Sequence, residues 1–170
     1  MEKIFFKEFI DASLLRINEN TIKIKVCMKQ LDEKDIWFRH NEHVNSVGNI
    51  ILHLCGNIRQ YIISSVGGAP DIRERDIEFS TVNGFTKAEL TAKWQDTMHE
   101  AIAIIAHAGS ENLLRHRVVQ GSTLSGIGII IHVTEHYSYH TGQIIFLTKL
   151  FKDVDTGFYN DIDLNQRNTF

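Results

Sequence analysis

Three histidines recur at four-residue spacing towards the C-terminal end of the chain, in the run His132-Val-Thr-Glu-His136-Tyr-Ser-Tyr-His140. Residues four apart share one face of an α-helix, so two neighbouring imidazoles of this run can bind one metal ion at about 2.0–2.1 Å. Across eight residues the face turns by about 80°, so all three should not bind the same ion. The spacing therefore predicts a metal-binding pair. It leaves open whether His136 pairs with His132 or with His140.

The segment from His132 to His136 also reads H-x-x-E-H, the pattern of inverted zinc peptidases, in which the glutamate is the general base. Such peptidases need a further carboxylate ligand from another helix, and no convincing candidate follows in the sequence. Glu135 lies about 100° from His136 around the helix, where it can pair with a charge on another helix. We favour this structural role for Glu135 and keep the peptidase interpretation as a minor alternative.

Polar side chains line one face of a second predicted helix. They fall within about 40° of one another on a helical projection and are Ser46, Asn49, His53, Asn57, Gln60 and Ser64. Between residues 44 and 66 the only formally charged side chain is Arg59, which indicates burial. An unpaired buried polar group costs about 1–3 kcal/mol, so this face should be a site, a hydrogen-bonded network or a wet cavity. Asn57 and Gln60 either orient ligands or substrate beside His53, or bridge helices.

Four helices are expected to position these residues, because Pro70 is the only proline and long segments separate the Gly and Asn clusters. The expected ranges are 3–31, 45–65, 86–109 and 123–151. Thr86 and Glu89 form a capping box, the clearest start signal. Gly126 and Gly128 each cost about 1 kcal/mol relative to Ala inside a helix, so the start of the last helix is the least well defined. This start is suited to close packing against another helix, within the chain or across a dimer.

The bulk properties describe one globular domain, expected over residues 1–152, with a loosely ordered tail over 153–170. The formal net charge is −3, and no block of Lys or Arg forms the basic patch that a phosphate backbone requires, so we expect no nucleic-acid partner. Residues 122–148 carry little charge but are too polar for a membrane span. We find no export signal, and the two cysteines, Cys27 and Cys55, fit a reducing compartment. We therefore expect a cytoplasmic protein without membrane contact.

The connection APDIRERDIEFSTVNG between the second and third helices is charged and long enough to cross the end of a bundle or to form a lid. Arg59, Arg73 and Arg75 could receive an anionic substrate there. A solvated loop, with Asp76 or Glu78 as ion-pair partners, explains most of these arginines equally well, and we favour that interpretation.

Three segments of the chain, together with the helix after Thr86, resemble proteins of the DinB-like family. They are NSVGNIILHLCGNIRQYI, GGAPDIRERDIEFS and HVTEHYSYHTGQIIFL, and the first is similar to a subgroup with an HLxGNxRQ segment. The resemblance implies an all-α fold, a four-helix bundle of the DinB type with a crossed connection. It also implies one metal ion bound by a histidine of the second helix and an H-x-x-x-H pair of the last, here His53, His136 and His140. His132 then packs beside the ligands.

Three histidine ligands leave positions open for water or substrate, as in catalytic sites. The all-nitrogen set suits a divalent transition metal, for which we place zinc first, nickel second, and iron or manganese after them. Relatives in the wider family include bacillithiol S-transferases and a mycothiol-dependent maleylpyruvate isomerase. The resemblance thus implies a thiol S-transferase or a hydrolase that acts on a small-molecule substrate, such as a low-molecular-weight thiol, and forms a homodimer. The alternative is a non-catalytic, dimeric metal-binding or stress-response module.

Overall fold

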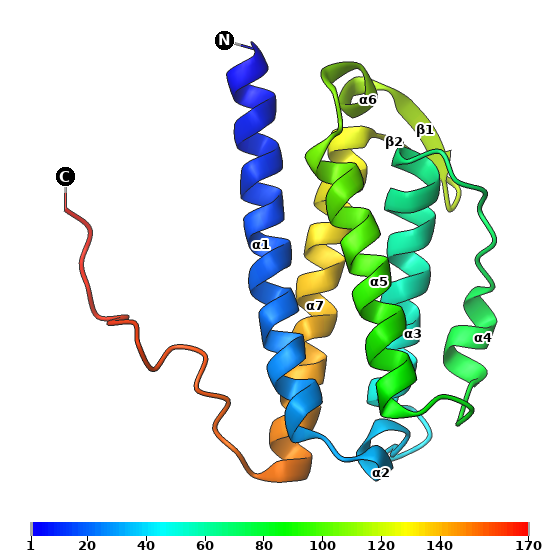
Figure 1. The fold of residues 1–170 in the computed structure, drawn as a ribbon, viewed down its shortest axis with the longest axis vertical. Helices are drawn as coiled ribbons and strands as arrows, with labels where there is room; N and C mark the ends of the chain where they lie inside the picture. Colours follow the sequence, from blue (N-terminus) through cyan, green and yellow to red (C-terminus); the bar gives the residue numbers. More distant parts are fainter. Residues whose placement is uncertain (1, 170) are drawn as a thin grey trace.

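A computed structural model describes residues 2–169 of the chain and shows a predominantly helical protein. Four long helices lie side by side (Figure 1): α1 (Glu2–Gln30), α3 (Val47–Ile58) with its π-helical continuation η1 (Arg59–Val66), α5 (Lys87–Ala106) and α7 (Gly126–Lys152). The shorter elements are α2 (Glu33–Ile36), α4 (Arg75–Ser80), α6 (Ser110–Leu114) and the strands β1 (His116–Val119) and β2 (Ser122–Ser125). The predicted all-α fold class is confirmed. Over residues 2–169, no helix combines the length and apolar character needed to cross a membrane.

The long helices form two parallel pairs of opposite direction (Figure 1). α1 and α7 run one way and pack on each other, while α3 and α5 run the other way and also pack on each other. Because α3 and α5 are parallel, residues 67–86 must return along the outside of the four long helices before α5 begins (Figure 1). This return contains α4, which packs on α3. The connection therefore passes the helix that carries His53.

The predicted helix starts coincide with capping side chains. The Ser46 hydroxyl accepts a hydrogen bond from the Asn49 N–H at 3.1 Å and begins α3. At α5, the Thr86 hydroxyl accepts from the Glu89 N–H at 3.2 Å, and the Glu89 carboxylate accepts from the Thr86 N–H at 2.8 Å. The capping box predicted at Thr86 is confirmed. The helix itself ends at Ala106, before the predicted Gly109, and α6 follows as a separate element.

The prediction that the last helix starts at residue 123 was wrong. Residues 122–125 instead form β2, which pairs antiparallel with β1 from Val119↔Ser122 to His116↔Ser125. The turn between the strands has positive φ at both central residues, 47° at Gln120 and 78° at Gly121, the arrangement whose twist matches a hairpin. Glutamine is an uncommon residue at the first of these positions, which is why the sequence pattern did not reveal the hairpin.

Helix α7 starts at Gly126, which is in close contact with α6. A Cβ atom at Gly126 would lie 2.4 Å from the Asn112 carbonyl oxygen and 2.8 Å from the Leu113 Cα. The close packing expected at this glycine is therefore made within the chain. The Ser125 hydroxyl caps the helix by accepting from the Gly128 N–H at 3.1 Å.

The buried core joins α1, α5 and α7 through a polar contact as well as apolar packing. Tyr137 is 1% exposed, and its hydroxyl accepts from the indole N–H of Trp94 at 3.2 Å and lies 3.0 Å from the Thr21 hydroxyl. This contact fixes the rotation of α7 about its axis. Since His136 and His140 lie on the same helix, the rotation also decides where their rings point.

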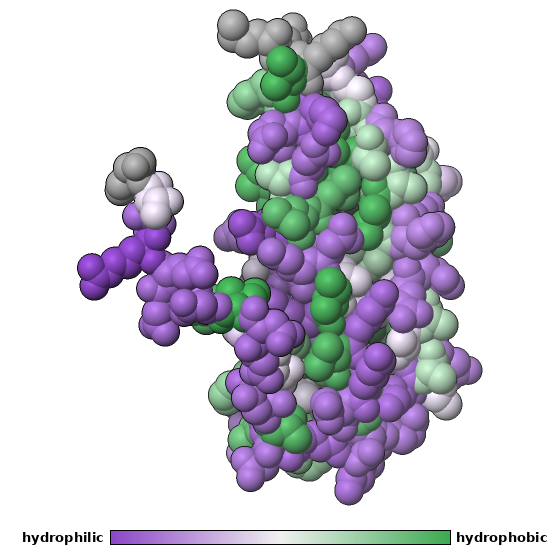
Figure 2. Space-filling view, turned by 60° about the vertical axis from the view of Figure 1, so that its left-hand side comes forward, coloured by the Kyte–Doolittle hydropathy of each residue, from purple (hydrophilic) through white to green (hydrophobic). Residues whose placement is uncertain are grey.

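Residues 153–169 contain turns but neither helix nor strand, and they lead away from the long helices (Figures 1 and 2). Figure 2 shows that this segment is mainly hydrophilic. Lys23 donates to the Tyr159 hydroxyl at 3.1 Å, which ties the start of the segment to α1. The division into a domain over 1–152 and a loosely ordered tail over 153–170 stays a prediction.

Candidate metal centre

Three imidazole nitrogens converge between α3 and α7. The Nε2 atom of His136 lies 3.1 Å from the Nε2 atom of His53 and 3.2 Å from that of His140. Two nitrogens that each lie about 2.0–2.1 Å from a tetrahedral ion are separated by roughly 3.3–3.4 Å. The three side chains are largely buried and could hold one metal ion. The structure thus brings together the three histidines that the family resemblance implied as ligands.

Two of these rings have their tautomers set by neighbours. His53 Nδ1 lies 2.8 Å from Glu78 Oε2, and His140 Nδ1 lies 2.7 Å from Gln143 Oε1. A carboxylate or amide oxygen only accepts hydrogen bonds, so each Nδ1 must carry the proton. In its neutral form, each of these two rings therefore presents the lone pair of Nε2 towards His136.

His136 cannot satisfy both lone pairs by hydrogen bonding. Its Nε2 can carry a single proton, which leaves one of the two short nitrogen–nitrogen contacts without a hydrogen. Burial, together with the neighbouring His140 and His53, lowers the pKa of His136 to about 3, so the ring is neutral at pH 7. A cation would accept all three lone pairs at once, with the His136 proton on Nδ1, a buried atom that lacks a partner within residues 2–169. The donor set therefore fits a bound metal.

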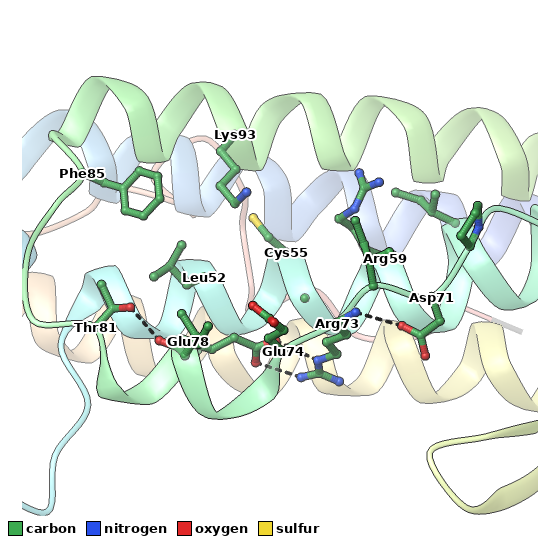
Figure 3. Close-up of a pocket in the computed structure, with 15 residues that line it drawn as sticks. Leu52, Cys55, Arg59, Asp71, Arg73, Glu74, Glu78, Thr81, Phe85 and Lys93 are labelled. Atoms are coloured by element: carbon green, nitrogen blue, oxygen red, sulfur yellow. Dashed lines mark hydrogen bonds and ion pairs between the residues drawn. The ribbon is translucent and has the colours of Figure 1, made fainter.

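Glu78 is held in place by Arg73. The guanidinium donates from Nε to Oε1 at 2.7 Å and from Nη2 to Oε2 at 2.9 Å, and the two side chains are 3% and 8% exposed. Burial raises the pKa of Glu78, but the hydrogen bonds from Arg73 and His53 outweigh it, and the net pKa is lowered. The sequence allowed Asp76 or Glu78 as partners for these arginines in a solvated loop; the structure pairs Arg73 with Glu78 (Figure 3), and both side chains are buried. The charge of Arg73 is therefore already neutralised.

A glycine on α3 makes room for this carboxylate. A Cβ atom at Gly56 would lie 1.8 Å from Glu78 Oε1 and 2.7 Å from its Cδ. Sequence reasoning missed Glu78 as the partner of His53. The available signal was Gly56 itself, three residues after His53 on a buried helix, where a glycine indicates that another group approaches the backbone.

The backbone of α4 is held by hydrogen bonds from Asn49 of α3 and from Arg39. Asn49, which is fully buried, donates to the carbonyl oxygens of Glu78 at 3.0 Å and Thr81 at 2.6 Å. Arg39 donates to the Phe79 carbonyl and to Asn49 Oδ1, both at 2.8 Å. These hydrogen bonds fix the position of α4 along the axis of α3, and thereby the position of the Glu78 side chain.

Gln60, Asn57 and His132, which the sequence also singled out, have different surroundings. Gln60 bridges η1 to the connection, because it accepts from Arg73 at 2.9 Å and donates to Asp71 at 2.8 Å. Asn57 is buried, and its Oδ1 has no partner in the part of the chain that the structure describes. The His132 ring stacks on Tyr61 with centroids 4.3 Å apart, and its nitrogens stay outside the converging group.

Glu135 faces a different part of the molecule. It lines a groove between α1 and α7 together with Ser13 and Arg16, away from the converging nitrogens. The peptidase interpretation required His132 and His136 to share an ion with Glu135 beside it. The structure instead groups His136 with His140, one turn later on α7.

Two aromatic rings flank the histidines. Phe79 of α4 lies 4.8 Å from the His53 ring and Tyr139 of α7 lies 4.9 Å from the His140 ring, between centroids. Tyr139 is 64% exposed. The site is therefore bordered by apolar surface on its α4 and α7 sides.

A family model described as a protein of unknown function (DUF1572) matches residues 5–159. That family lies within the DinB/YfiT-like superfamily. No curated protein matches the chain. The match covers α1 from residue 5, the other three long helices in full, and the three converging histidines.

Proposed function

This chain belongs to the DUF1572 family of the DinB/YfiT-like superfamily, and we propose that it is a metal-dependent enzyme of the DinB-like type. One divalent ion would be held by His53, His136 and His140. The observation that carries the proposal is the convergence of three Nε2 atoms, two of them on rings whose Nδ1 atoms hydrogen-bond to side-chain oxygens. Imidazole ligands suit zinc, our first choice, then nickel, with iron or manganese after them.

The surrounding side chains have assignable tasks. When bound, a divalent ion lowers the pKa of the water or thiol that it activates, so that a nucleophile is available at neutral pH. Glu78 and Gln143 hold the Nδ1 protons of His53 and His140, which orients the rings and makes Nε2 more basic. Arg73 keeps Glu78 ionised, so that the carboxylate can accept the hydrogen bond from Nδ1 of His53.

A donor set of three histidines would leave a coordination position open on a bound ion, which supports catalysis over a purely structural metal site. Within residues 2–169, the converging group comprises three histidines, and neither a cysteine nor a carboxylate joins it. Structural zinc sites have four protein ligands, whereas catalytic sites have three and leave one position for water or substrate. This supports the enzyme over the non-catalytic metal-binding module.

The protein's own thiols are poorly placed to act as nucleophiles. Cys27 and Cys55 are both buried, and burial raises the pKa of Cys55 to about 11. The nucleophile should therefore come from outside the chain, as a small thiol or as water. We propose thiol S-transfer or hydrolysis on a small-molecule substrate as the reaction, in a cytoplasmic homodimer.

The first test is elemental analysis of protein purified without chelator and then reconstituted with zinc, nickel or manganese. We expect about one ion per chain in the wild type, and its loss in His53→Ala and His140→Ala. The matched control is His99→Ala, an exposed histidine of α5, which should keep the ion. Protein that takes up none of these metals would overturn the proposal and leave a helical binding module as the better account.

His132→Ala separates the two possible histidine pairs. Because His132 stands outside the converging group, this variant should retain the ion, whereas His140→Ala should lose it. The opposite pattern would restore the H-x-x-E-H pair. Loaded protein can then be assayed for thiol transfer and hydrolysis, and a metal ion without an exchangeable position would favour the non-catalytic module.

A further inference from the structure

Buried side-chain atoms without a hydrogen-bond partner are concentrated in one part of the molecule. Within residues 2–169 there are four such atoms, and three of them belong to α3 and α7, which pack on each other. These three are Asn57 Oδ1, His132 Nε2 and His136 Nδ1. Buried polar groups nearly always have a protein or water partner, so each exception needs an explanation. Three exceptions on two packed helices indicate one shared cause.

Two contacts across the helices place these atoms at one level of the bundle. The Nε2 atom of His53 lies 3.1 Å from that of His136. One step further along, the Tyr61 ring stacks on His132, with centroids 4.3 Å apart. Asn57 lies midway between His53 and Tyr61 in the chain, four residues from each. Because α3 and α7 run in opposite directions, Asn57 lies opposite the turn of α7 between His132 and His136 (Figure 1).

His136 differs from the other two candidate ligands in the surroundings of its Nδ1 atom. Nδ1 of His53 lies 2.8 Å from a Glu78 oxygen. Nδ1 of His140 lies 2.7 Å from the Gln143 side-chain oxygen. A histidine that binds a metal almost always donates its second ring N–H to a carboxylate, a carbonyl oxygen or a water molecule. When Nε2 of His136 binds the ion, its proton lies on Nδ1, and this donor needs an acceptor.

The three unpartnered atoms have the donor and acceptor capacities that one water molecule requires. Asn57 Oδ1 only accepts, a protonated His136 Nδ1 donates, and His132 Nε2 accepts when the proton of its neutral ring lies on Nδ1. A water molecule can therefore accept from His136 and donate to Asn57 and His132. Buried water molecules typically make about three hydrogen bonds to groups that otherwise lack a partner. Asn57 is 3% exposed, so a water molecule held there would be part of the folded structure.

We propose that Asn57 is a positioning residue for His136. Its Oδ1 atom holds the Nδ1 proton of His136 through one buried water molecule, which also donates a hydrogen bond to Nε2 of His132. Asn57 thus does for His136 what Glu78 and Gln143 do for the other two ligands, and it keeps the lone pair of His136 Nε2 available to the ion. This role rests on the proposed metal site.

The first test measures the zinc affinity of the full-length protein by competition with a chromophoric chelator. Asn57→Ala removes the acceptor and should weaken zinc binding about 10–100-fold, the usual effect of losing the second partner of a ligating histidine. Asn57→Asp keeps an acceptor oxygen on a side chain of nearly the same shape and should restore most of the affinity. The matched control is Asn20→Ala, which removes a buried asparagine of α1 that donates to the Arg16 carbonyl oxygen. It should bind zinc like the wild type, even if it is less stable.

The second test follows the proton itself in zinc-loaded protein with ¹⁵N-labelled histidine. Long-range ¹H–¹⁵N correlation spectra of the wild type should show His136 protonated at Nδ1, with this proton protected from exchange with solvent. In Asn57→Ala the Nδ1 proton of His136 should exchange faster, while that of His53 stays protected. A purely structural role of Asn57 would lower the free energy of unfolding without a selective change at one ring.

The outcomes separate this inference from the proposed function. Wild-type protein that takes up neither zinc, nickel nor manganese would overturn the proposed function itself. If the wild type binds zinc, equal affinity in Asn57→Ala, or His136 protonated at Nε2, would overturn only the role of Asn57. Should Asn57→Ala not fold, a crystal structure of the zinc-loaded wild type decides. The water molecule must then lie within hydrogen-bonding distance of both Asn57 Oδ1 and His136 Nδ1, and its absence there would overturn the inference.

Discussion

Glu78 Oε2 lies 2.8 Å from Nδ1 of His53, and the opposite nitrogen of the same ring faces His136 at 3.1 Å. The carboxylate belongs to α4, in the connection between two parallel helices, and not to the helices that supply the histidines. The segment that closes the fold therefore also orients a candidate ligand. Substitutions in this connection should therefore change the affinity of the histidines for a metal ion.

Replacing Glu78 by Gln should weaken metal binding about 10–100-fold, because the second partner of a ligating histidine tunes its orientation and basicity. It should also lower the free energy of unfolding by on the order of 3 kcal/mol, since Arg73 stays buried without an anionic partner. Competition with a chromophoric chelator measures the affinity, and urea unfolding measures the stability. Glu74→Gln, an exposed neighbour, should change neither quantity; equal metal affinity in Glu78→Gln and the wild type would contradict the assigned role.

A methyl group at position 56 should displace the Glu78 carboxylate from His53. The Cβ of Gly56→Ala would lie 1.8 Å from Glu78 Oε1, so the carboxylate must move although alanine favours a helix. We expect weaker metal binding and a loss of about 1–3 kcal/mol of stability. Gly142→Ala on α7, where the added Cβ meets nothing within 4 Å, should instead stabilise by up to about 1 kcal/mol. If the two variants behave alike in urea unfolding and chelator competition, Gly56 has no special role.

Removing the Asn49 side chain should loosen α4. Asn49→Ala leaves the carbonyl oxygens of Glu78 and Thr81 without their donor, and each unsatisfied buried group costs about 1–3 kcal/mol. We expect a loss of at least about 2 kcal/mol in unfolding free energy, together with faster hydrogen exchange in residues 75–81. The control is Asn45→Ala, just outside α3. Unchanged exchange in α4 would show that apolar packing alone holds the connection.

The stability of the protein should fall in alkaline solution, in part because of Cys27. Burial raises the pKa of this thiol above 9.0, with a hydrogen bond to Thr148 acting in the opposite direction. Above pH 9 the unfolded chain therefore loses a proton that the folded chain retains, and the free energy of unfolding declines by at most about 1.4 kcal/mol per pH unit.

The comparison is with Cys27→Ala, which should be less stable than the wild type at pH 7, by an amount that shrinks as the pH rises past 9. Ile24→Val, a buried truncation on the same helix without a titrating group, should keep a constant difference. Urea unfolding at several pH values measures both. A constant difference for Cys27→Ala would mean that this thiol does not titrate differently in the two states.

Local patterns in the sequence determined the four long helices. Apolar periodicity and the side chains of Ser46 and Thr86 act within one or two helical turns, so their effect can be read along the chain. Helical spacing is also local, and it predicted that His136 forms a metal-binding pair with a histidine one turn away. It could not choose between His132 and His140, and there the family resemblance supplied the choice.

The rest depended on tertiary structure. Glu78 reaches His53 from 25 positions further along the chain, because Asn49 binds backbone carbonyl oxygens of the connection and Gly56 leaves space for the carboxylate. Every residue has the same backbone carbonyl oxygen, so no residue pattern in the connection predicts where the connection packs on α3. The sequence by itself thus determined which helices carry the histidines. Long-range hydrogen bonds and close packing decided which nitrogens converge and which protons they keep.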